Sequence, residues 1–315
     1  MADTVTIPVP TASSTTHVKP KSRRLRGGWR EAGVAWLFLL PALLGFLVFF
    51  LYPTLRGFYL SFTDYDLLTA PQWVGLKNFE KLVGDPLFWN SLKVTLEYVV
   101  INIGVQTFVA LGLALLMHRL AKSTVIRGII LLPYLISSVV VALLWYWMAD
   151  VNLGVINQVL GWIGVDPVAF FGEGTWAIPT IALVNVWKFM GYTALLIFAG
   201  LQAIPATLYE AADVDGANEW TVFWRITVPM LRPVLTLVLI LTIIGSWQIF
   251  DTVAITTKGG PINSTRVIQY YIFDQAFSRY NFGYASAISV VLFLILAGVA
   301  FAQMKLTRSD ESDLA

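Results

Sequence analysis

The sequence predicts an all-α integral membrane protein with six transmembrane helices. Of its 315 residues, 57% are hydrophobic and 13% are charged, and six long intervals contain almost no charged residue. A water-soluble domain carries about 25% charged residues, whereas a membrane-spanning helix needs roughly 20 consecutive, mostly apolar residues. The mean hydropathy of +0.71 therefore indicates that lipid surrounds most of the chain.

The first three spans are expected at 32–55, 95–117 and 127–149. The first lies between Glu31 and Arg56, the second ends before His118, and the third ends before Asp150. Each interval is long enough to cross the hydrocarbon layer as an α-helix, which rises about 1.5 Å per residue.

The last three spans are expected at 176–201, 233–257 and 280–304. The fourth contains one charged residue, Lys188, and the fifth contains Asp251. Prolines such as Pro41, Pro133 and Pro179 do not argue against these helices, because neighbouring helices in a membrane can satisfy the freed backbone groups.

The chain ends are expected to lie outside a membrane domain that covers residues 31–306. Residues 1–30 are basic and begin with a stretch rich in Ser, Thr and Pro, so they are predicted to be a disordered tail. Residues 307–315 form a second tail. A basic stretch before an apolar run can also begin a signal peptide, but the run from Val34 is longer than a signal core of about 7 to 15 residues. We therefore expect this run to remain as a membrane anchor.

The distribution of Lys and Arg predicts the orientation. Thirteen of these residues lie on one side of the membrane: before the first span, between spans two and three, between spans four and five, or after the sixth. Seven lie in the connecting segments on the other side. Because cytoplasmic loops carry an excess of Lys and Arg, both termini are expected to be cytoplasmic.

The composition argues against catalysis and metal binding. The chain has no Cys and two His, so it can form neither a disulfide nor a thiolate or His-rich metal site. It also lacks the Gly-x-x-x-x-Gly-Lys-Ser/Thr phosphate-binding motif, so it cannot hydrolyse ATP by that route. We expect no catalytic residue, no metal and no cofactor in this chain.

The segment 205–233, between the fourth and fifth spans, is expected to form a cytoplasmic loop with two short helices. Thr207 and Glu210 fit a capping box, in which the hydroxyl and the carboxylate bond to each other's free backbone donors. Gly216 fits a helix stop with positive φ. The intervening helix of about eight residues is too short to be stable alone, so it needs a partner surface.

This loop contains Glu210, Ala211, Ala212, Gly216, Ile226 and Pro229. At these spacings the residues resemble the cytoplasmic loop motif of the membrane subunits of bacterial ABC importers, except that Val228 stands where the family has Leu. The resemblance implies that the loop is the coupling helix, which sits in a cleft of the ATPase subunit. The implied coupling residues are Glu210, Ala211, Ala212, Asp215, Gly216 and Ala217.

Further matches extend the resemblance over about residues 30–308. They are Trp73–Phe79, Asn185–Trp187, Phe250–Asp251 and Gly259–Pro261. The chain is similar to the larger permease subunit of maltose-type and glycerol-phosphate-type importers, in the carbohydrate-uptake branch. This resemblance implies a six-helix permease in a bacterial inner membrane, with the coupling helix between the fourth and fifth spans.

The resemblance also implies the partners. They are a second homologous permease, a dimer of ATPase subunits that bind ATP and Mg²⁺, an extracytoplasmic binding protein and the sugar that it delivers. No nucleic acid is implied.

Polar side chains inside the fourth and fifth spans are the candidate solute contacts, because such groups in a membrane helix usually face a cavity or a partner. Asn185, Lys188 and Tyr192 share one helix face. Thr242 and Ser246 share another. The resemblance implies sugar contacts at Asn185, Trp187, Lys188, Phe189, Tyr192, Thr242, Gly245, Ser246 and Ile249.

Two roles fit Lys188. It pairs with Asp251 of the fifth span, or it contacts the solute, where its point charge would suit a phosphate or carboxylate. The alternative solute class is therefore of the glycerol-phosphate type, moved by the same mechanism.

The sequence favours an importer permease for a sugar or sugar-like solute over two other classes. An ion-driven secondary transporter predicts an internal repeat and a carboxylate deep in a helix. No repeat is found, and Asp251 is the only carboxylate well inside a span. A membrane-embedded enzyme needs a paired nucleophile and base, and the sequence offers no plausible pair.

Overall fold

The computed structural model describes residues 29–120 and 123–308. The predicted tails lie outside these residues, except that Trp29 and Arg30 already belong to the first helix and Arg308 ends the last one.

The first of two compact units ends at Thr54 and contains one continuous run of helix. α1 (Trp29–Phe46) leads through a π-helical turn, η1 (Leu47–Leu51), into α2 (Tyr52–Leu60), which continues into the second unit. The stretch Trp36–Leu60 is long and apolar enough to cross a membrane, and it corresponds to the first predicted span.

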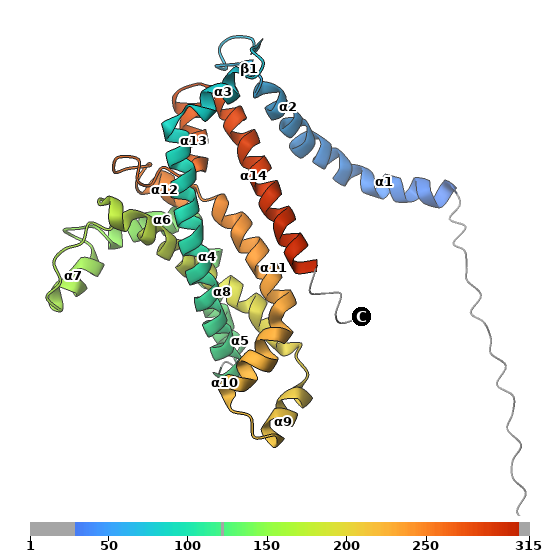
Figure 1. The fold of residues 1–315 in the computed structure, drawn as a ribbon, viewed down its shortest axis with the longest axis vertical. Helices are drawn as coiled ribbons and strands as arrows, with labels where there is room; N and C mark the ends of the chain where they lie inside the picture. Colours follow the sequence, from blue (N-terminus) through green and yellow to red (C-terminus); the bar gives the residue numbers. More distant parts are fainter. Residues whose placement is uncertain (1–28, 121–122, 309–315) are drawn as a thin grey trace, which may run out of the picture. The chain divides into compact units, whose positions relative to one another are not determined.

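The second unit, from Leu55 onward, contains a bundle of helices with a two-stranded hairpin at one end (Figure 1). Its elements after α2 are β1 (Thr63–Asp64), β2 (Gln72–Trp73), α3 (Lys77–Val83), α4 (Pro86–Leu120), α5 (Thr124–Leu135), α6 (Ser138–Met148), α7 (Val155–Trp162), α8 (Gly174–Gln202), α9 (Ala206–Val214), α10 (Glu219–Val222), η2 (Phe223–Thr227), α11 (Val228–Trp247), α12 (Asp251–Ile255), α13 (Ile268–Phe273), η3 (Asp274–Ser278) and α14 (Phe282–Arg308).

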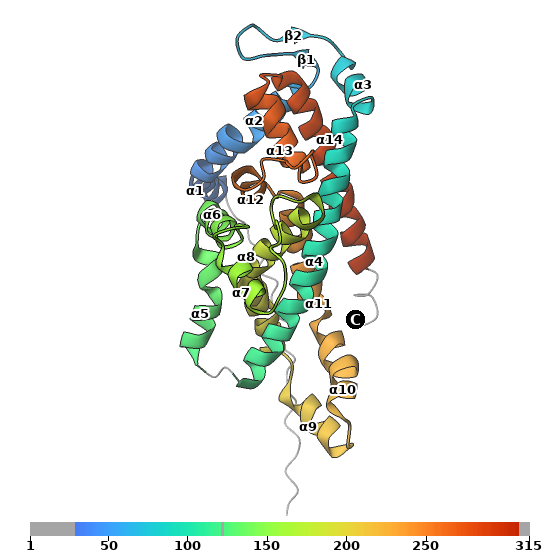
Figure 2. The same cartoon turned by 90° about the vertical axis from the view of Figure 1, so that its left-hand side faces the viewer.

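Different short elements lie at the two ends of this bundle. β1 and β2 pair antiparallel, with Thr63 opposite Trp73. The hairpin, α3 and α13 lie at one end, whereas α9 and α10 lie at the other (Figures 1 and 2). The long helices α4 and α11 extend toward the α9 end (Figures 1 and 2).

Five helices among the described residues are long and apolar enough to cross a membrane: Trp36–Leu60, Pro86–Arg119, Gly174–Gln202, Glu219–Ile255 and Phe282–Gln303. The predicted third span, 127–149, is instead a broken pair, because α5 and α6 meet at an angle of 89°. Ile136 and Ser137 at the break leave the helical region, with ψ values of 140° and 139°. Pro133 weakens the end of α5, because it has no N–H to donate to the helix ladder.

The predicted fifth span also has different limits. Helix runs without interruption from Glu219 through η2 to Trp247, and it stops at Gln248–Phe250 before α12. The second short helix expected within 205–233 is therefore the start of this long helix. The side chain of Asn218 caps it.

Two apolar clusters hold the bundle together, and a polar layer separates them. On α4, Val99 belongs to the first cluster and Ala110 to the second. On α8, Val184 belongs to the first and Ala194 to the second, and α11 shows the same change along its length. Lipid offers no hydrogen-bond partners, so polar side chains between the clusters must bond to one another or face a cavity.

α5 and α8 approach so closely at Gly191 that a side chain would not fit between them. A Cβ atom at Gly191 would lie 2.0 Å from the carbonyl oxygen of Ile130. Small residues permit this close approach of helices in membranes. The contact brings Tyr134, one turn after Ile130, against Tyr192 of α8.

Asp85, between α3 and α4, joins three elements at the hairpin end. Its carboxylate accepts hydrogen bonds from the hydroxyl of Tyr271 on α13 and from that of Tyr284 on α14, the latter at 2.5 Å. Burial alone would raise the pKa of Asp85, but the two hydroxyls and the backbone N–H of Leu87 outweigh it and lower the pKa below its ordinary value. Burial and the bond to Asp85 raise the pKa of Tyr271 to about 12.

We expect the stability of the protein to depend on the ionisation of Asp85. A carboxyl group whose pKa is lowered by folding stabilises the folded state above its unfolded pKa of about 3.9, and this stabilisation is lost as the pH falls through the folded pKa. The melting temperature in detergent should therefore fall as the pH drops below about 4. Asp85→Asn should lower the melting temperature at neutral pH and flatten its pH dependence. An unchanged pH dependence in this variant would contradict the role given to Asp85.

Candidate functional site

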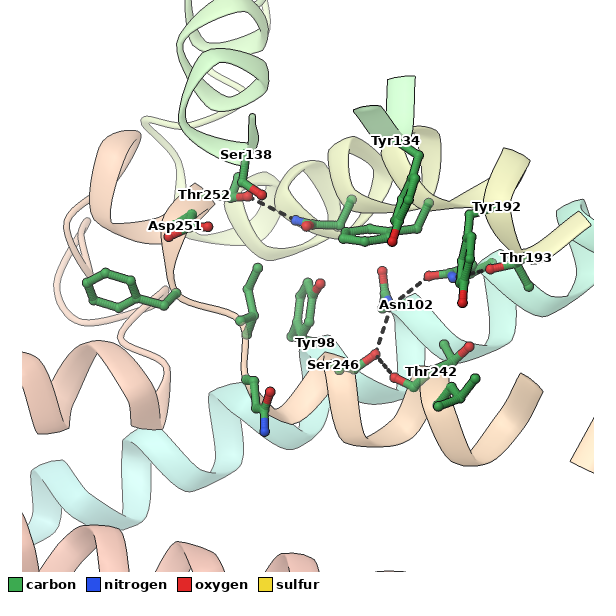
Figure 3. A pocket seen from close by; sticks show the side chains of 18 residues that line it. Tyr98, Asn102, Tyr134, Ser138, Tyr192, Thr193, Thr242, Ser246, Asp251 and Thr252 are labelled. Atoms are coloured by element: carbon green, nitrogen blue, oxygen red, sulfur yellow. Dashed lines mark hydrogen bonds between the residues drawn. The ribbon is translucent and has the colours of Figure 1, made fainter. Parts of the chain in front are cut away.

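A cavity of about 240 Å³ lies in the polar layer between the two apolar clusters (Figure 3). Its walls come from α4, α8, α11, the junction of α5 and α6, and the segment from Gln248 into α12. Five aromatic rings, four side-chain amides and five Ser or Thr hydroxyls line it. Among its described lining residues, Asp251 is the only charged one.

Seven of the nine predicted solute contacts line this cavity: Asn185, Phe189, Tyr192, Thr242, Gly245, Ser246 and Ile249. Those on α8 recur every three or four residues, so they share a helix face. Thr242 and Ser246 share a face of α11 in the same way, whereas Ile249 follows after that helix has ended.

The other two predicted contacts, Trp187 and Lys188, do not line the cavity. The Trp187 ring packs edge-to-face against Trp145 of α6, with the ring centres 5.6 Å apart. Lys188 is 6% exposed, and its ammonium group donates a hydrogen bond to Ser138 Oγ at 2.6 Å. The ion pair considered for Lys188 and Asp251 does not occur among the ion pairs of the described residues.

The sequence reasoning missed the α4 side of the cavity. Tyr98, Asn102 and Gln106 line it, and their spacing of four residues places them on one helix face. A polar stripe within an apolar span usually faces a cavity or a partner, so this pattern could have identified these residues from the sequence. Tyr134 and Ser138 were also missed, because they reach the cavity through the break between α5 and α6.

Aromatic rings form one wall of the cavity. The rings of Tyr134 and Tyr192 stack with centres 4.6 Å apart and planes 12° from parallel. Phe189 packs edge-on against Tyr134 at 5.8 Å. Figure 3 shows Tyr134 on one side of the cavity and Ser246 and Thr242 on the other. The cavity thus has a flat apolar wall and a polar wall.

A ladder of hydrogen bonds crosses the polar wall from α11 through α4 to α8. The Ser246 hydroxyl donates to the Thr242 carbonyl oxygen at 2.7 Å and accepts from Asn102 Nδ2 at 2.9 Å. Asn102 Nδ2 also donates to Gln106 Oε1 at 3.2 Å. Gln106 Nε2 then donates to Thr193 Oγ1 at 2.8 Å. The ladder fixes three helices relative to one another and sets the shape of the cavity.

The predicted coupling residues lie on α9 and in the turn that follows it. α9 begins at Ala206 after Pro205, and no side chain caps it. The capping box predicted for Thr207 and Glu210 is therefore wrong, because Thr207 already lies inside the first helical turn.

The helix stop predicted at Gly216 is present. Gly216 has a φ of 68°, and its N–H donates to the Asp213 carbonyl at 3.1 Å, while the Ala217 N–H donates to the Ala212 carbonyl at 2.9 Å. This pair of bonds is a Schellman motif, which favours Gly at the position with positive φ. The exposed members of the predicted coupling set are Glu210, Ala211, Asp215 and Gly216.

Membrane-crossing helices that surround a polar cavity, with a short exposed helix at one end, define a membrane transport subunit. The chain belongs to the family of binding-protein-dependent transport system inner membrane components, which it matches over residues 106–306. This range includes α8, α9 and α11 and therefore most of the cavity wall.

Known proteins are similar to this chain over most of their length. The chain is 38% identical to the probable ABC transporter permease protein YesP of Bacillus subtilis, over 88% of this chain and 90% of the relative. It is 35% identical to the trehalose/maltose transport system permease protein MalF of Thermococcus litoralis, over 89% and 95%. It is also similar to a chain of a bacterial alginate ABC transporter, crystallised in complex with an alginate pentasaccharide-bound periplasmic protein. That match has a TM-score of 0.79 and 25% identity, over 90% of this chain and 98% of the other.

The bond between Lys188 and Ser138 predicts a specific dependence of stability on both residues. Ser138→Ala would leave a buried ammonium group without its hydrogen bond, which costs about 1.5–3 kcal/mol for a charged group. It should therefore lower the melting temperature of the purified protein in the wild-type background but have little effect in a Lys188→Met background.

Asp251→Asn is the matched comparison for this pair. Asp251→Asn, rather than Ser138→Ala, could be the change that lowers the melting temperature only when Lys188 is present. In that case Asp251 balances the charge of Lys188, and the bond to Ser138 does not explain the burial of Lys188.

Proposed function

We propose that this chain is one permease subunit of an ATP-driven ABC importer and forms half of the pathway for a sugar delivered by an extracytoplasmic binding protein. The observation that carries the proposal is the cavity, in which stacked aromatic rings face amides and hydroxyls. A sugar ring has an apolar face that packs on aromatic rings and hydroxyls that bond to amides. The relatives named for trehalose, maltose and alginate support this solute class.

The charges around the cavity favour a neutral sugar. Lys188 does not line the cavity, and its ammonium group is engaged by the hydroxyl of Ser138. Asp251 does line the cavity, and a carboxylate there repels an anionic solute. A glycerol-phosphate-type solute therefore fits this half of the pathway less well than a neutral sugar.

The exposed surface of α9 suits an ATPase partner. Val214 is 89% exposed, although it is apolar, and Glu210 and Asp215 are exposed beside it. A helix of 9 residues gains stability mainly from packing against other surfaces. We infer that a dimer of ATPase subunits, which would bind ATP and Mg²⁺, receives α9 in a cleft of one subunit.

A continuous structural route connects α9 to the cavity. Tyr209 of α9 and Thr227 of η2 share a hydrogen bond at 3.2 Å. The helix that contains Thr227 continues to Trp247 and places Thr242 and Ser246 in the cavity wall. Movement of α9 on ATP binding would therefore shift that wall and change which side of the membrane the cavity faces.

The remaining pathway would come from a second, homologous permease. We place α9 and both termini in the cytoplasm of a bacterial cell, because Arg119, which pairs with Glu219 of α10, and Arg225 of η2 lie in segments next to α9, and cytoplasmic segments are rich in Lys and Arg.

The proposal is tested with the complete importer in liposomes, supplied with its binding protein and with maltose, trehalose or an alginate oligosaccharide. We expect ATP-dependent import of a neutral sugar and little import of the acidic one. Gly216→Val should reduce import by about tenfold or more, because a side chain at positive φ costs roughly 1–2 kcal/mol and disrupts the end of α9.

Gly298→Val is the matched control. It lies at an exposed position of α14 without positive φ or close neighbours, so import should remain near the wild-type rate. If the Gly216 variant imports at the wild-type rate, the coupling role is contradicted. If the importer moves only the alginate oligosaccharide, the proposed solute class is contradicted.

The proposed orientation is tested with introduced cysteines, because the chain has none of its own. Ile262 is 98% exposed in the segment between α12 and α13, so Ile262→Cys should react with a membrane-impermeant thiol reagent added outside intact cells. Asn218→Cys, beside α9, should react only after the membrane is opened. The reverse pattern would place α9 outside the cell.

A further inference from the structure

Asn102, in the middle of α4, combines burial with an unused hydrogen-bond acceptor. It lines the cavity and is 4% exposed. Its Nδ2 takes part in the ladder described above, but its Oδ1 is buried and has no hydrogen-bond partner among the described residues. A buried acceptor without a partner is unfavourable, so this position requires an explanation.

The ladder determines which atom of Asn102 faces the cavity. The Thr242 carbonyl can only accept, so the hydroxyl hydrogen of Ser246, 2.7 Å away, must point toward it. Ser246 Oγ can then only accept from Asn102, which must present its NH₂ group at 2.9 Å. The same NH₂ group donates to Gln106 Oε1. Both donor hydrogens of Asn102 are therefore used, and its Oδ1 is left beside the cavity (Figure 3).

This geometry selects the chemistry of the bound group. A carbonyl oxygen binds hydrogen-bond donors such as hydroxyl groups. Carboxylate and phosphate oxygens that are ionised can only accept, so they would meet Asn102 Oδ1 with repulsion. A neutral, hydroxyl-rich solute supplies the missing donor.

We propose that Asn102 is a solute-binding residue, and that its Oδ1 accepts a hydrogen bond from a sugar hydroxyl. The inference rests on the proposed function and adds the second span to the binding surface. Because the same side chain holds Ser246 and Gln106, sugar binding at Asn102 is linked directly to the helix that continues toward α9.

Two substitutions separate the acceptor from the structural role of Asn102. Asn102→Leu removes the acceptor and both donated bonds. Asn102→Asp keeps an oxygen acceptor but loses the amide donors. Both should lower the melting temperature of the complex. Both variants lose the amide donors of the ladder, so the difference between them reports the acceptor: we expect the KM for maltose import to be about tenfold higher in the Leu variant than in the Asp variant, the effect of one lost hydrogen bond. Equal increases in KM would mean that Asn102 acts only by holding the helices, and the inference would be wrong.

A second measurement needs only the wild-type protein. The complete importer is trapped with maltose, or with trehalose if maltose is not imported, and its structure is determined. A sugar oxygen should lie within hydrogen-bonding distance, about 3 Å, of Asn102 Oδ1; a sugar bound elsewhere in the cavity overturns the inference and leaves the proposed function intact. Failure of the wild-type importer to move either sugar overturns both.

Discussion

The hydrogen-bond ladder from Thr242 through Asn102 to Thr193 is the interaction on which the centre of this protein depends. In a membrane, polar groups must find partners inside the protein. The ladder satisfies this requirement for three helices at once, since Ser246 lies on α11, Asn102 on α4 and Thr193 on α8. It also keeps the polar layer open between two apolar clusters. The cavity therefore exists because the three helices are tied at one level while their apolar faces pack above and below it.

The opposite wall depends on two departures from regular helix packing. The break at Ile136 and Ser137 turns the chain by 89°, and it places Tyr134 and Ser138 on either side of the bend. The close approach at Gly191 then holds α5 against α8. Without that small residue, Tyr134 could not stack on the neighbouring ring of α8 at 4.6 Å. A straight third span would have supplied neither the aromatic wall nor the hydroxyl that binds Lys188.

The proposed transmission of movement from α9 to the cavity depends on a few connected elements. α9 is a short helix with a Schellman end at Gly216, and Tyr209 connects it to the long helix that begins at Glu219. That helix leads to Ser246 and thus to the ladder. A displacement of α9 therefore acts on a connected, hydrogen-bonded structure, and the ladder is where such a displacement would reach the solute.

The sequence by itself determined the membrane class, the approximate positions of five of the six predicted spans, the helix stop at Gly216 and the polar faces of α8 and α11. These features depend on residues that are close together in the chain, because helical periodicity decides which side chains share a face. The tertiary structure decided the rest. Asn102 and its partner Ser246 are 144 residues apart, and Lys188 and Ser138 are 50 residues apart. Periodicity shows that such side chains need a partner, but only the packing of distant helices selects which one they meet.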